Sequence, residues 1–156
     1  MKRSEPVPVP VIADTREPCP PPWRFSPACR VIRRCLPTGD YSVDGFETRI
    51  TIERKTLPDF VACCCSAERD RFVREIERLA TFEVKAILVE ANVEHVVARA
   101  YRSLAHPNSI MGPAAAFLVD HGVPVIWAGD AIEAAAFAER VLVPFWNKQH
   151  QAEVAA

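Results

Sequence analysis

Residues 39–59 read GDYSVDGFETRITIERKTLPD, and this stretch sets both the expected fold and the expected chemistry. The Asp44-Gly45 pair lies between two segments rich in strand-forming residues, 40–43 and 46–55. An Asp-Gly pair in such a setting is typical of a β-hairpin, because both residues accept the backbone angles of a tight turn. The stretch therefore predicts two antiparallel strands that lie side by side.

The charged residues of the second strand alternate between its two faces. Side chains two residues apart share a face, so we expect Glu53 and Lys55 to be neighbours roughly 7 Å apart, with Arg54 on the opposite face. Asp40 belongs to the paired strand, and Asp14 ends an earlier one. Carboxylates bind Mg²⁺ or Mn²⁺, which activate water against a phosphate, and a nearby Lys stabilises developing negative charge. This set suits phosphodiester cleavage, although Glu-x-Lys by itself is also common on ordinary solvated strands.

The rest of the chain alternates between strand and helix patterns. Strands are expected at Val7–Ala13, Ala28–Cys35, Lys85–Glu90 and Val123–Ala128. Helices are expected from Pro58 to about Ala80 with a break near Ser66, over Asn92–Arg102 and Ser109–His121, and from an Asp130 cap to about Lys148. This alternation predicts an α/β fold with a central mixed β-sheet flanked by helices. Trp23 and Phe25 follow a proline-rich loop, and they either pack over the sheet edge or stack on a base.

The composition is that of one globular domain. The chain has 156 residues, of which 49% are hydrophobic and 25% charged, and no apolar run reaches the ~18 residues of a membrane span. The basic pair in MKRSEPVPVPV is not followed by the apolar segment of a secretory signal. We expect a single domain over residues 9–148 between flexible tails at 1–8 and 149–156. The preference for Arg over Lys and the Ala-rich composition indicate a GC-rich bacterial genome. We expect a cytoplasmic protein that a bacterium or a phage encodes.

The charges give no overall basic surface, since the net charge is −1 and the pI is about 6.4. The 19 basic residues are nevertheless 15 Arg and 4 Lys, and Arg clusters occur within residues 30–34 and 69–78. Arg contacts phosphate through paired hydrogen bonds, but acidic residues interleave with the second cluster. Phosphate contacts and surface ion pairs therefore both remain open for these clusters.

The six cysteines lie at positions 19, 29, 35 and 63–65. Without a secretory signal they are expected to be reduced, and their spacing lacks the close pairs of a structural zinc site. Most are therefore expected to be small core residues. A redox or metal-thiolate protein is the alternative, which a thiol titration with and without zinc would test.

Three motifs, in order, resemble the nuclease domain of the XPF/Hef family of structure-specific endonucleases. They are D-T-R-E at 14–17, G-D within LPTGDY at 36–41, and E-R-K-x-x-x-D at 53–59. Looser similarity in ERDRF, ILVE and HGVPVIW extends the resemblance over roughly residues 9–145. The resemblance implies a restriction-endonuclease-like fold, the PD-(D/E)xK nuclease fold. It also implies cutting of branched DNA near single-strand/duplex junctions with Mg²⁺ or Mn²⁺.

The resemblance also implies roles for individual residues. The implied catalytic set comprises Asp14, Asp40, Glu53, Arg54, Lys55 and Asp59. Within it, Asp40 and Glu53 would be the main metal ligands, and Asp14 would contribute directly or through water. Lys55 would be the catalytic lysine. Contacts with DNA are implied for Arg16, Arg71 and Arg74, although Arg74 stands where the family often has Gln.

The resemblance does not indicate which parts of the protein hold the DNA duplex. Family members usually carry a tandem helix-hairpin-helix domain, and only a short tail follows residue 150 here. We therefore expect a homodimer or a partner subunit to help hold the DNA, through the C-terminal helices. The apolar candidates for that contact are Phe137, Val141, Phe145 and Trp146. Exposed apolar patches of this size are uncommon in monomers, which favours the dimer. The alternative is that these side chains only pack onto their own sheet.

Two functions follow from the resemblance. The first is a metal-dependent DNA endonuclease that cuts branched or flap junctions in repair, recombination or phage DNA processing. The second is a catalytically silent scaffold of the same fold that binds DNA or a partner. A silent member is expected to lose part of the acid–lysine set. This chain keeps Asp14, Asp40, Glu53, Lys55 and Asp59, which favours the nuclease.

Overall fold

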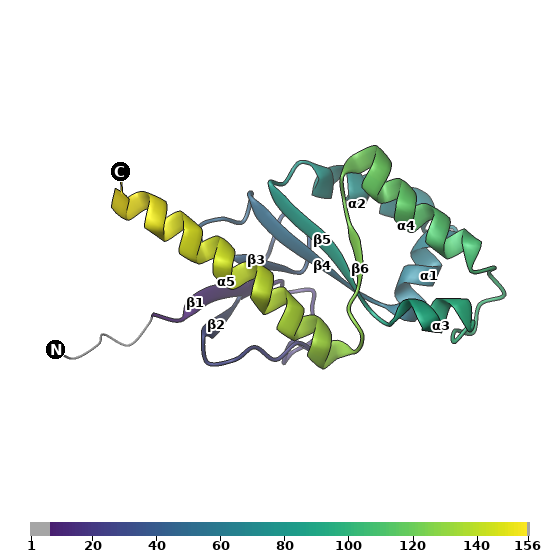
Figure 1. The fold of residues 1–156 in the computed structure, drawn as a ribbon, viewed down its shortest axis with the longest axis horizontal. Helices are drawn as coiled ribbons and strands as arrows, with labels where there is room; N and C mark the ends of the chain where they lie inside the picture. Colours follow the sequence, from purple (N-terminus) through teal and green to yellow (C-terminus); the bar gives the residue numbers. More distant parts are fainter. Residues whose placement is uncertain (1–6, 156) are drawn as a thin grey trace.

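The computed structural model describes residues 7–155, with side chains through residue 151 (Figure 1). The strands are β1 (Val9–Ala13), β2 (Cys29–Arg33), β3 (Tyr41–Val43), β4 (Ile50–Thr56), β5 (Val84–Glu90) and β6 (Val125–Trp127). The helices are α1 (Leu57–Cys65), α2 (Arg69–Ala80), α3 (Val93–Val97), α4 (Asn108–His121) and α5 (Ala131–Ala155). No helix in the described part of the chain combines the length and the apolarity that crossing a membrane requires.

The strands form one mixed sheet in the order β2-β1-β3-β4-β5-β6. β1 runs parallel to β2 and antiparallel to β3, and β3 runs antiparallel to β4. β4, β5 and β6 are parallel to one another. β4 pairs with β5 along its whole length, from Ile50 opposite Val84 to Thr56 opposite Glu90. The strand that carries Glu53 and Lys55 is therefore held in the middle of the sheet.

Helices cover both faces of the sheet, because the buried strands are apolar on both sides. Ile87 and Val89 of β5 pack against α1, α2 and α4. The residues between them, Ala86 and Leu88, pack against α5 on the other face. Figure 1 shows α5 crossing one face of the sheet while α1, α2 and α4 lie on the other side. The predicted architecture of a mixed sheet flanked by helices is confirmed.

The hairpin is present, but its connection is longer than the two-residue turn predicted from Asp44-Gly45. β3 ends at Val43 and β4 begins at Ile50, so residues 44–49 form the connection. Gly45 has a φ of 83°, and the Phe46 N–H donates to the Val43 carbonyl at 2.9 Å. The connection is held by tertiary packing, because the Phe46 ring contacts the Phe145 ring of α5 edge to face at 5.5 Å. The turn signal located the hairpin but could not report this contact.

Two helix ends also differ from the expected ones. α3 ends at Val97 and not near Arg102, because Arg99 adopts a left-handed backbone with a φ of 55° that a helix cannot continue through. α5 continues to Ala155, so the tail expected from residue 149 is helical up to that point. Residues 1–6 of the expected N-terminal tail lie outside the described residues.

Among the cysteines, Cys63 and Cys64 are buried, whereas Cys19, Cys35 and Cys65 are exposed, so the expectation that most are core residues was wrong.

Candidate active site

Asp40 is placed by the glycine that precedes it. Gly39 has a φ of 80°, in the left-handed region that glycine tolerates, and a Cβ at this position would collide with the Thr51 hydroxyl. That hydroxyl is buried and donates to the Thr38 carbonyl at 2.9 Å. Only glycine therefore fits beside β4 here, and Asp40 follows where the chain enters β3.

The Asp40 carboxylate is held against β4 by backbone hydrogen bonds. The Asp40 N–H donates to the Ile52 carbonyl at 2.9 Å, and the Arg54 N–H donates to Asp40 Oδ2 at 2.8 Å. These two bonds bracket Glu53, whose side chain lies on the face of β4 that α1 and α2 cover. Asp40 and Glu53 are therefore brought together by strand pairing, as the sequence predicted.

Glu53 and Lys55 form an ion pair on the same face of β4. The side chain of Glu53 is buried and that of Lys55 is mostly buried. The Lys55 ammonium lies 5.2 Å from the centre of the Phe72 ring of α2, a distance at which ring and cation attract. The alternation predicted for β4 is confirmed, because Arg54 points to the opposite face.

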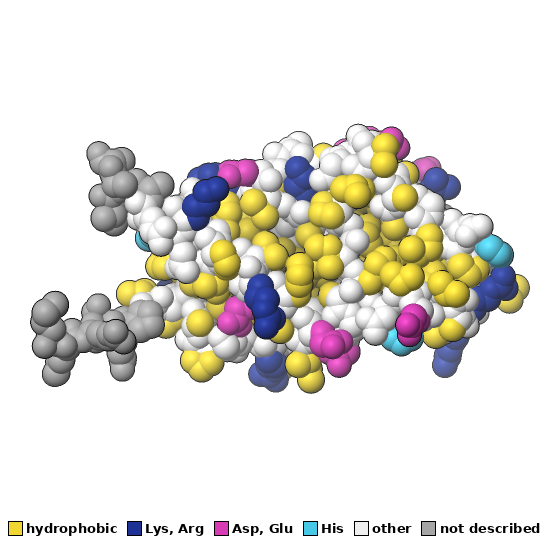
Figure 2. All heavy atoms as spheres, viewed as in Figure 1, with side chains coloured by type: hydrophobic (Ala, Val, Ile, Leu, Met, Phe, Trp, Pro, Cys, Tyr) yellow, Lys and Arg dark blue, Asp and Glu magenta, His cyan; other side chains and the backbone are white. Residues whose placement is uncertain are grey.

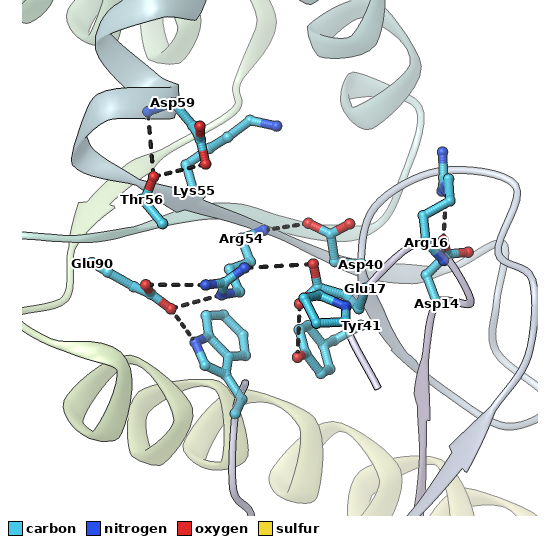
Figure 3. Close-up of polar contacts among 12 residues, drawn as sticks. Asp14, Arg16, Glu17, Asp40, Tyr41, Arg54, Lys55, Thr56, Asp59 and Glu90 are labelled. Carbon is cyan, nitrogen blue, oxygen red and sulfur yellow. Dashed lines mark hydrogen bonds and ion pairs between the residues drawn. The ribbon is translucent and has the colours of Figure 1, made fainter. Parts of the chain in front are cut away.

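Asp59 lies in the first turn of α1, and Thr56 is the N-cap of that helix. The Thr56 hydroxyl donates to Asp59 Oδ2 at 2.7 Å, and the Asp59 N–H donates to the Thr56 hydroxyl oxygen at 3.3 Å (Figure 3). Pro58 occupies the first turn, where its missing N–H has no helical partner to lose. These contacts fix the direction in which the chain leaves Lys55 and enters the helix.

Several of the residues described so far line one cavity of about 360 Å³. Its charged lining includes Glu17, Asp40, Glu53, Lys55, Asp59 and Arg71. Adding Arg54 and Glu68, which also line it, gives five carboxylates and three cationic side chains. The cavity therefore carries more negative than positive charge, so a bound cation would be attracted and a bare phosphate would not.

Burial shifts the pKa of each central group. Burial raises the pKa of Asp40 to about 6, and the charges of Glu17 and Glu75 add to this, against the Arg54 N–H that favours the ionised form. Burial and the neighbouring Asp40 charge also raise the pKa of Glu53 well above its usual value. For Lys55, burial disfavours the charge, but the facing carboxylates outweigh it and raise its pKa above the usual value. Lys55 therefore stays protonated at neutral pH and can donate, but not accept, a proton.

Arg54 anchors a polar network on the α5 face of the sheet. Its Nε and Nη2 atoms donate to the two carboxylate oxygens of Glu90 at 2.7 and 3.3 Å, and its Nη1 lies 3.6 Å from Glu17 (Figure 3). The Trp23 indole N–H donates to Glu90 at 2.8 Å, and the Tyr41 hydroxyl donates to Glu17 at 3.0 Å. The Trp23 and Tyr41 rings stack with 4.5 Å between centres. Trp23 therefore packs within the protein, which is the first of the two alternatives predicted for it.

Asp14 is turned toward its own loop. Its Oδ1 accepts from the Arg16 N–H at 2.8 Å and the Arg16 side chain at 2.5 Å, and its Oδ2 accepts from the Leu36 N–H at 2.6 Å. Burial opposes ionisation, but these hydrogen bonds outweigh it, so the pKa of Asp14 lies below its usual value. Both carboxylate oxygens are occupied, and Asp14 does not line the cavity. Its geometry is that of a brace for the D-T-R-E loop.

Asp40 and Glu53 have the chemistry of a site for a hard divalent cation. Among the described residues, no group of three or more His, Cys, Asp or Glu side chains is arranged to hold a metal ion. Mg²⁺ does not require one, because it keeps several waters and is usually bound by one or two carboxylates together with substrate phosphate oxygens. Two carboxylates at the wall of an acidic, partly open cavity fit that mode of binding.

The family was decided by comparison with known proteins. A family model of the ERCC4 domain matches residues 13–141, which is most of the chain. The chain belongs to the ERCC4 domain family. A search of curated proteins found no match.

Solved structures agree with this membership of the ERCC4 domain family. XPF from Aeropyrum pernix is 29% identical with a TM-score of 0.64, over 85% of this chain and 59% of that one. XPF from Aeropyrum pernix in complex with DNA is 27% identical with a TM-score of 0.68, over 90% of this chain and 66% of that one. The restriction-endonuclease-like fold and the XPF-type nuclease domain predicted from the motifs are confirmed. This ERCC4 domain spans about three fifths to two thirds of the length of those two chains.

The ERCC4 domain gathers most of the residues singled out from the sequence. Asp40, Glu53, Lys55, Asp59 and Arg71 line one cavity, and Arg54 reaches it from the other face of β4. Two of the expected DNA contacts lie elsewhere. Arg16 binds Asp14 and reaches the Gly39 carbonyl at 3.3 Å, and Arg74 is exposed on α2 outside the cavity lining.

Sequence reasoning missed Glu75 and Glu90 around this site and left the role of Trp23 open between packing and base stacking. Glu75 of α2 is close enough for its charge to shift the pKa values of Asp40, Glu53 and Lys55. Glu90 binds the Arg54 side chain and Trp23 donates to Glu90, yet both are far from Arg54 in sequence. For Glu90, the available signal was its position as an acid that ends a buried apolar strand. Glu75 carried no local signal of this kind.

Proposed function

We propose that this ERCC4 domain is a metal-dependent endonuclease that hydrolyses phosphodiester bonds in DNA at branched or flap junctions. The observation that carries the proposal is the convergence of Asp40, Glu53 and Lys55 in one acidic cavity on β4 and its partner strand. Membership of the ERCC4 family and the similarity to an XPF that is bound to DNA support it. The biological setting that fits is DNA repair, recombination or phage DNA processing inside a bacterial cell.

The division of labour follows from the geometry. Asp40 and Glu53 would hold Mg²⁺ or Mn²⁺, and such an ion would supply positive charge to the phosphate and lower the pKa of a bound water. Lys55, kept protonated by its carboxylate neighbours, donates a hydrogen bond to a phosphate oxygen or to the leaving oxygen as charge develops. Arg71 at the exposed mouth of the cavity provides a further contact for the phosphate backbone.

A cleavage assay tests this function directly. We expect the purified chain to cut labelled flap or splayed-arm DNA in Mg²⁺ or Mn²⁺, to cut plain duplex much more slowly, and to be inactive in EDTA. Comparing the cleavage rates in Mg²⁺ and in Mn²⁺ decides which ion supports the reaction. Cutting that persists in EDTA would contradict the metal assignment. Failure to cut any branched substrate, with DNA binding retained, would favour the silent scaffold.

We also propose that two copies associate through the face formed by α4, β6 and α5. Figure 2 shows apolar side chains gathered across the middle of this face. All three residues of β6 are partly exposed at the sheet edge, and Leu118 and Val119 of α4 and Phe137 of α5 are exposed. Phe145, one of the four apolar candidates on α5, is instead buried against its own sheet. The apolar area left over is the kind that a second subunit covers.

The Phe137→Glu substitution tests the association. Sedimentation velocity should show a dimer for the parent chain and a shift toward monomer for the variant, with the dissociation constant raised at least about tenfold, because a charge is placed in an apolar contact. Val97→Glu, which changes an exposed apolar residue of α3 outside this face, serves as the control and should not change the mass. A monomeric parent chain at micromolar concentration would leave a different partner subunit as the remaining candidate.

A further inference from the structure

Two cavities lie side by side between the end of α1 and the α3–α4 loop, residues 98–107. The first, of about 270 Å³, is lined by residues that include Pro58, Val61, Tyr101 and Arg102. The second, of about 680 Å³, is lined by residues that include Arg69 and Leu104. The two cavities share Cys65, Ser66 and Ser103 in their walls, so they form one continuous groove, which we call the α1–loop groove.

The α1–loop groove begins at the active-site cavity. Ala62, one turn into α1, lines both that cavity and the first cavity of the groove. Pro58 lies next to Asp59, which also lines the active-site cavity. The active-site cavity and the groove therefore meet at Ala62 of α1.

The charged side chains of the groove have one sign. Among the described residues that line the two cavities, the charged ones are Arg69 and Arg102, and both are exposed. The active-site cavity next to it carries an excess of carboxylates, so the sign of the surface changes at Ala62. A groove lined by Arg attracts an anionic occupant.

The loop side of the groove is shaped before anything binds. Arg99 ends α3 in a left-handed backbone, the Tyr101 hydroxyl donates to the Ala105 carbonyl at 3.0 Å, and the Ala105 N–H donates to the Ser103 hydroxyl oxygen at 3.1 Å. These bonds hold Leu104 at the loop tip with 98% of its surface exposed. The groove thus offers apolar surface, an aromatic ring and guanidinium groups along one wall and loop.

We propose that the α1–loop groove binds the unpaired strand of nucleic acid that leads away from the cleaved phosphodiester. This inference rests on the proposed nuclease function and adds a second contact surface to it. Arg69 and Arg102 neutralise backbone phosphates, and bases lie against Pro58, Tyr101 and Leu104. An unpaired strand matches this mixture, because its bases and its phosphates are both free to make contacts. A duplex presents its phosphates outward and keeps its bases stacked inside, so it would leave the apolar wall without a partner.

Binding measurements with the paired substitution Arg69→Ala/Arg102→Ala test the inference. Fluorescence anisotropy in Ca²⁺, a hard cation that should keep the acidic site occupied, compares a duplex that carries a single-stranded arm with the same duplex made blunt. We expect the paired variant to bind the armed duplex about tenfold more weakly, with a salt dependence lower by up to about 1.4 in slope, because two phosphate contacts are lost. Binding of the blunt duplex should be unchanged.

The control is Arg30→Ala/Arg140→Ala, which removes the same charge from exposed positions on β2 and α5. Equal losses for the two paired variants, or equal losses on armed and blunt DNA, would overturn the groove while leaving the proposed nuclease function standing. The nuclease function fails on a separate observation, which is the absence of metal-dependent cutting by the parent chain.

A second measurement needs no substitution. Cys65 is exposed and lies in the wall that the two cavities share, whereas Cys35 is exposed at the end of β2. Armed DNA should slow the alkylation of Cys65 and leave that of Cys35 unchanged, as followed by mass spectrometry of the two peptides, because reaction requires access to the thiol. Equal alkylation of Cys65 with and without bound armed DNA would overturn the inference.

Discussion

Replacing Asp40 with Asn should lower metal-dependent cleavage on the order of 10³-fold and, at the same time, stabilise the metal-free protein. The Asn side-chain oxygen can still accept the hydrogen bond that the Arg54 N–H donates to Asp40 at 2.8 Å, so the local fold is retained. What is lost is one of the two carboxylate charges that we propose to hold the cation. Glu53→Gln removes the other charge and should lower cleavage similarly.

The stability effect follows from the raised pKa of Asp40. The folded protein binds this proton more tightly than the unfolded chain does, since the pKa rises from 3.8 to about 6 on folding. The free energy of unfolding therefore falls as the pH rises from 3.8 to about 6, and above that window the full cost of the buried charge is present. Asn carries no charge to bury. We expect Asp40→Asn to be more stable by roughly 1–3 kcal/mol at pH 8 without metal and equally stable at pH 3.

Urea unfolding in EDTA at several pH values, together with the cleavage assay, checks both halves of this prediction. The control is Asp44→Asn in the same hairpin, because Asp44 only pairs with Arg34 at the surface, at 2.6 Å. It should keep cleavage and change stability by less than about 1 kcal/mol. Normal cleavage by Asp40→Asn would remove Asp40 from the proposed metal site. A stability difference that does not depend on pH would show that another effect causes it.

Arg54→Ala should destabilise the fold by about 3–5 kcal/mol, because it leaves two nearly buried carboxylates without their cation. The side chains of Glu90 and Glu17 are 11% and 9% exposed, and both face the Arg54 guanidinium. The Trp23 and Tyr41 donors remain, but they do not neutralise the charges. Cleavage should fall as well, because the strand that presents the N–H to Asp40 is no longer anchored from the α5 face.

Arg34→Ala is the matched control, since Arg34 also bridges two acids, Asp44 and Glu47, but does so in solvent. Chemical denaturation should give Arg34→Ala an unfolding midpoint close to that of the parent chain. The double variant Arg54→Ala/Glu90→Gln should recover part of the stability lost in Arg54→Ala, because one uncompensated charge is removed. Equal unfolding midpoints for Arg54→Ala and Arg34→Ala would show that the network contributes no more than a surface ion pair.

Much of the site could be predicted because it is built from local rules. The alternation of Glu53, Arg54 and Lys55 follows from strand geometry, and the Asp-Gly pair indicated the hairpin that brings Asp40 to β4. The order of three motifs then indicated the family, which local pattern alone could not. The role of Asp14 was the hardest to predict, because the D-T-R-E motif is compatible with a metal ligand and with a residue that holds its own loop through hydrogen bonds. Its hydrogen bonds to Arg16 and Leu36 became visible only when the loop was folded.

The parts that escaped prediction depend on contacts between distant segments. The connection at 44–49 is held by the packing of Phe46 against Phe145, which no turn propensity reports. α3 stops early because the loop that follows it requires a left-handed Arg99. Glu90 meets Arg54 because β5 lies beside β4, and Trp23 meets Glu90 because the proline-rich loop folds over the sheet edge. Apart from the end of α3, each of these is a tertiary constraint with no signature within ten residues of the position it controls.

Arg54 has a consequence for anyone who transplants this motif. Its peptide group serves the carboxylate on one side of the sheet, while its guanidinium is secured on the other side by an acid from the neighbouring strand. Copying only the Glu and the Lys into a new scaffold would reproduce the residues that line the cavity. It would omit the contacts that hold the Arg between them on the other face of the sheet. A graft would need an acid at the end of the adjoining strand, at the position Glu90 holds here, and an indole above it. A sequence pattern used to find such sites would exclude more false matches if it also required that distant acid.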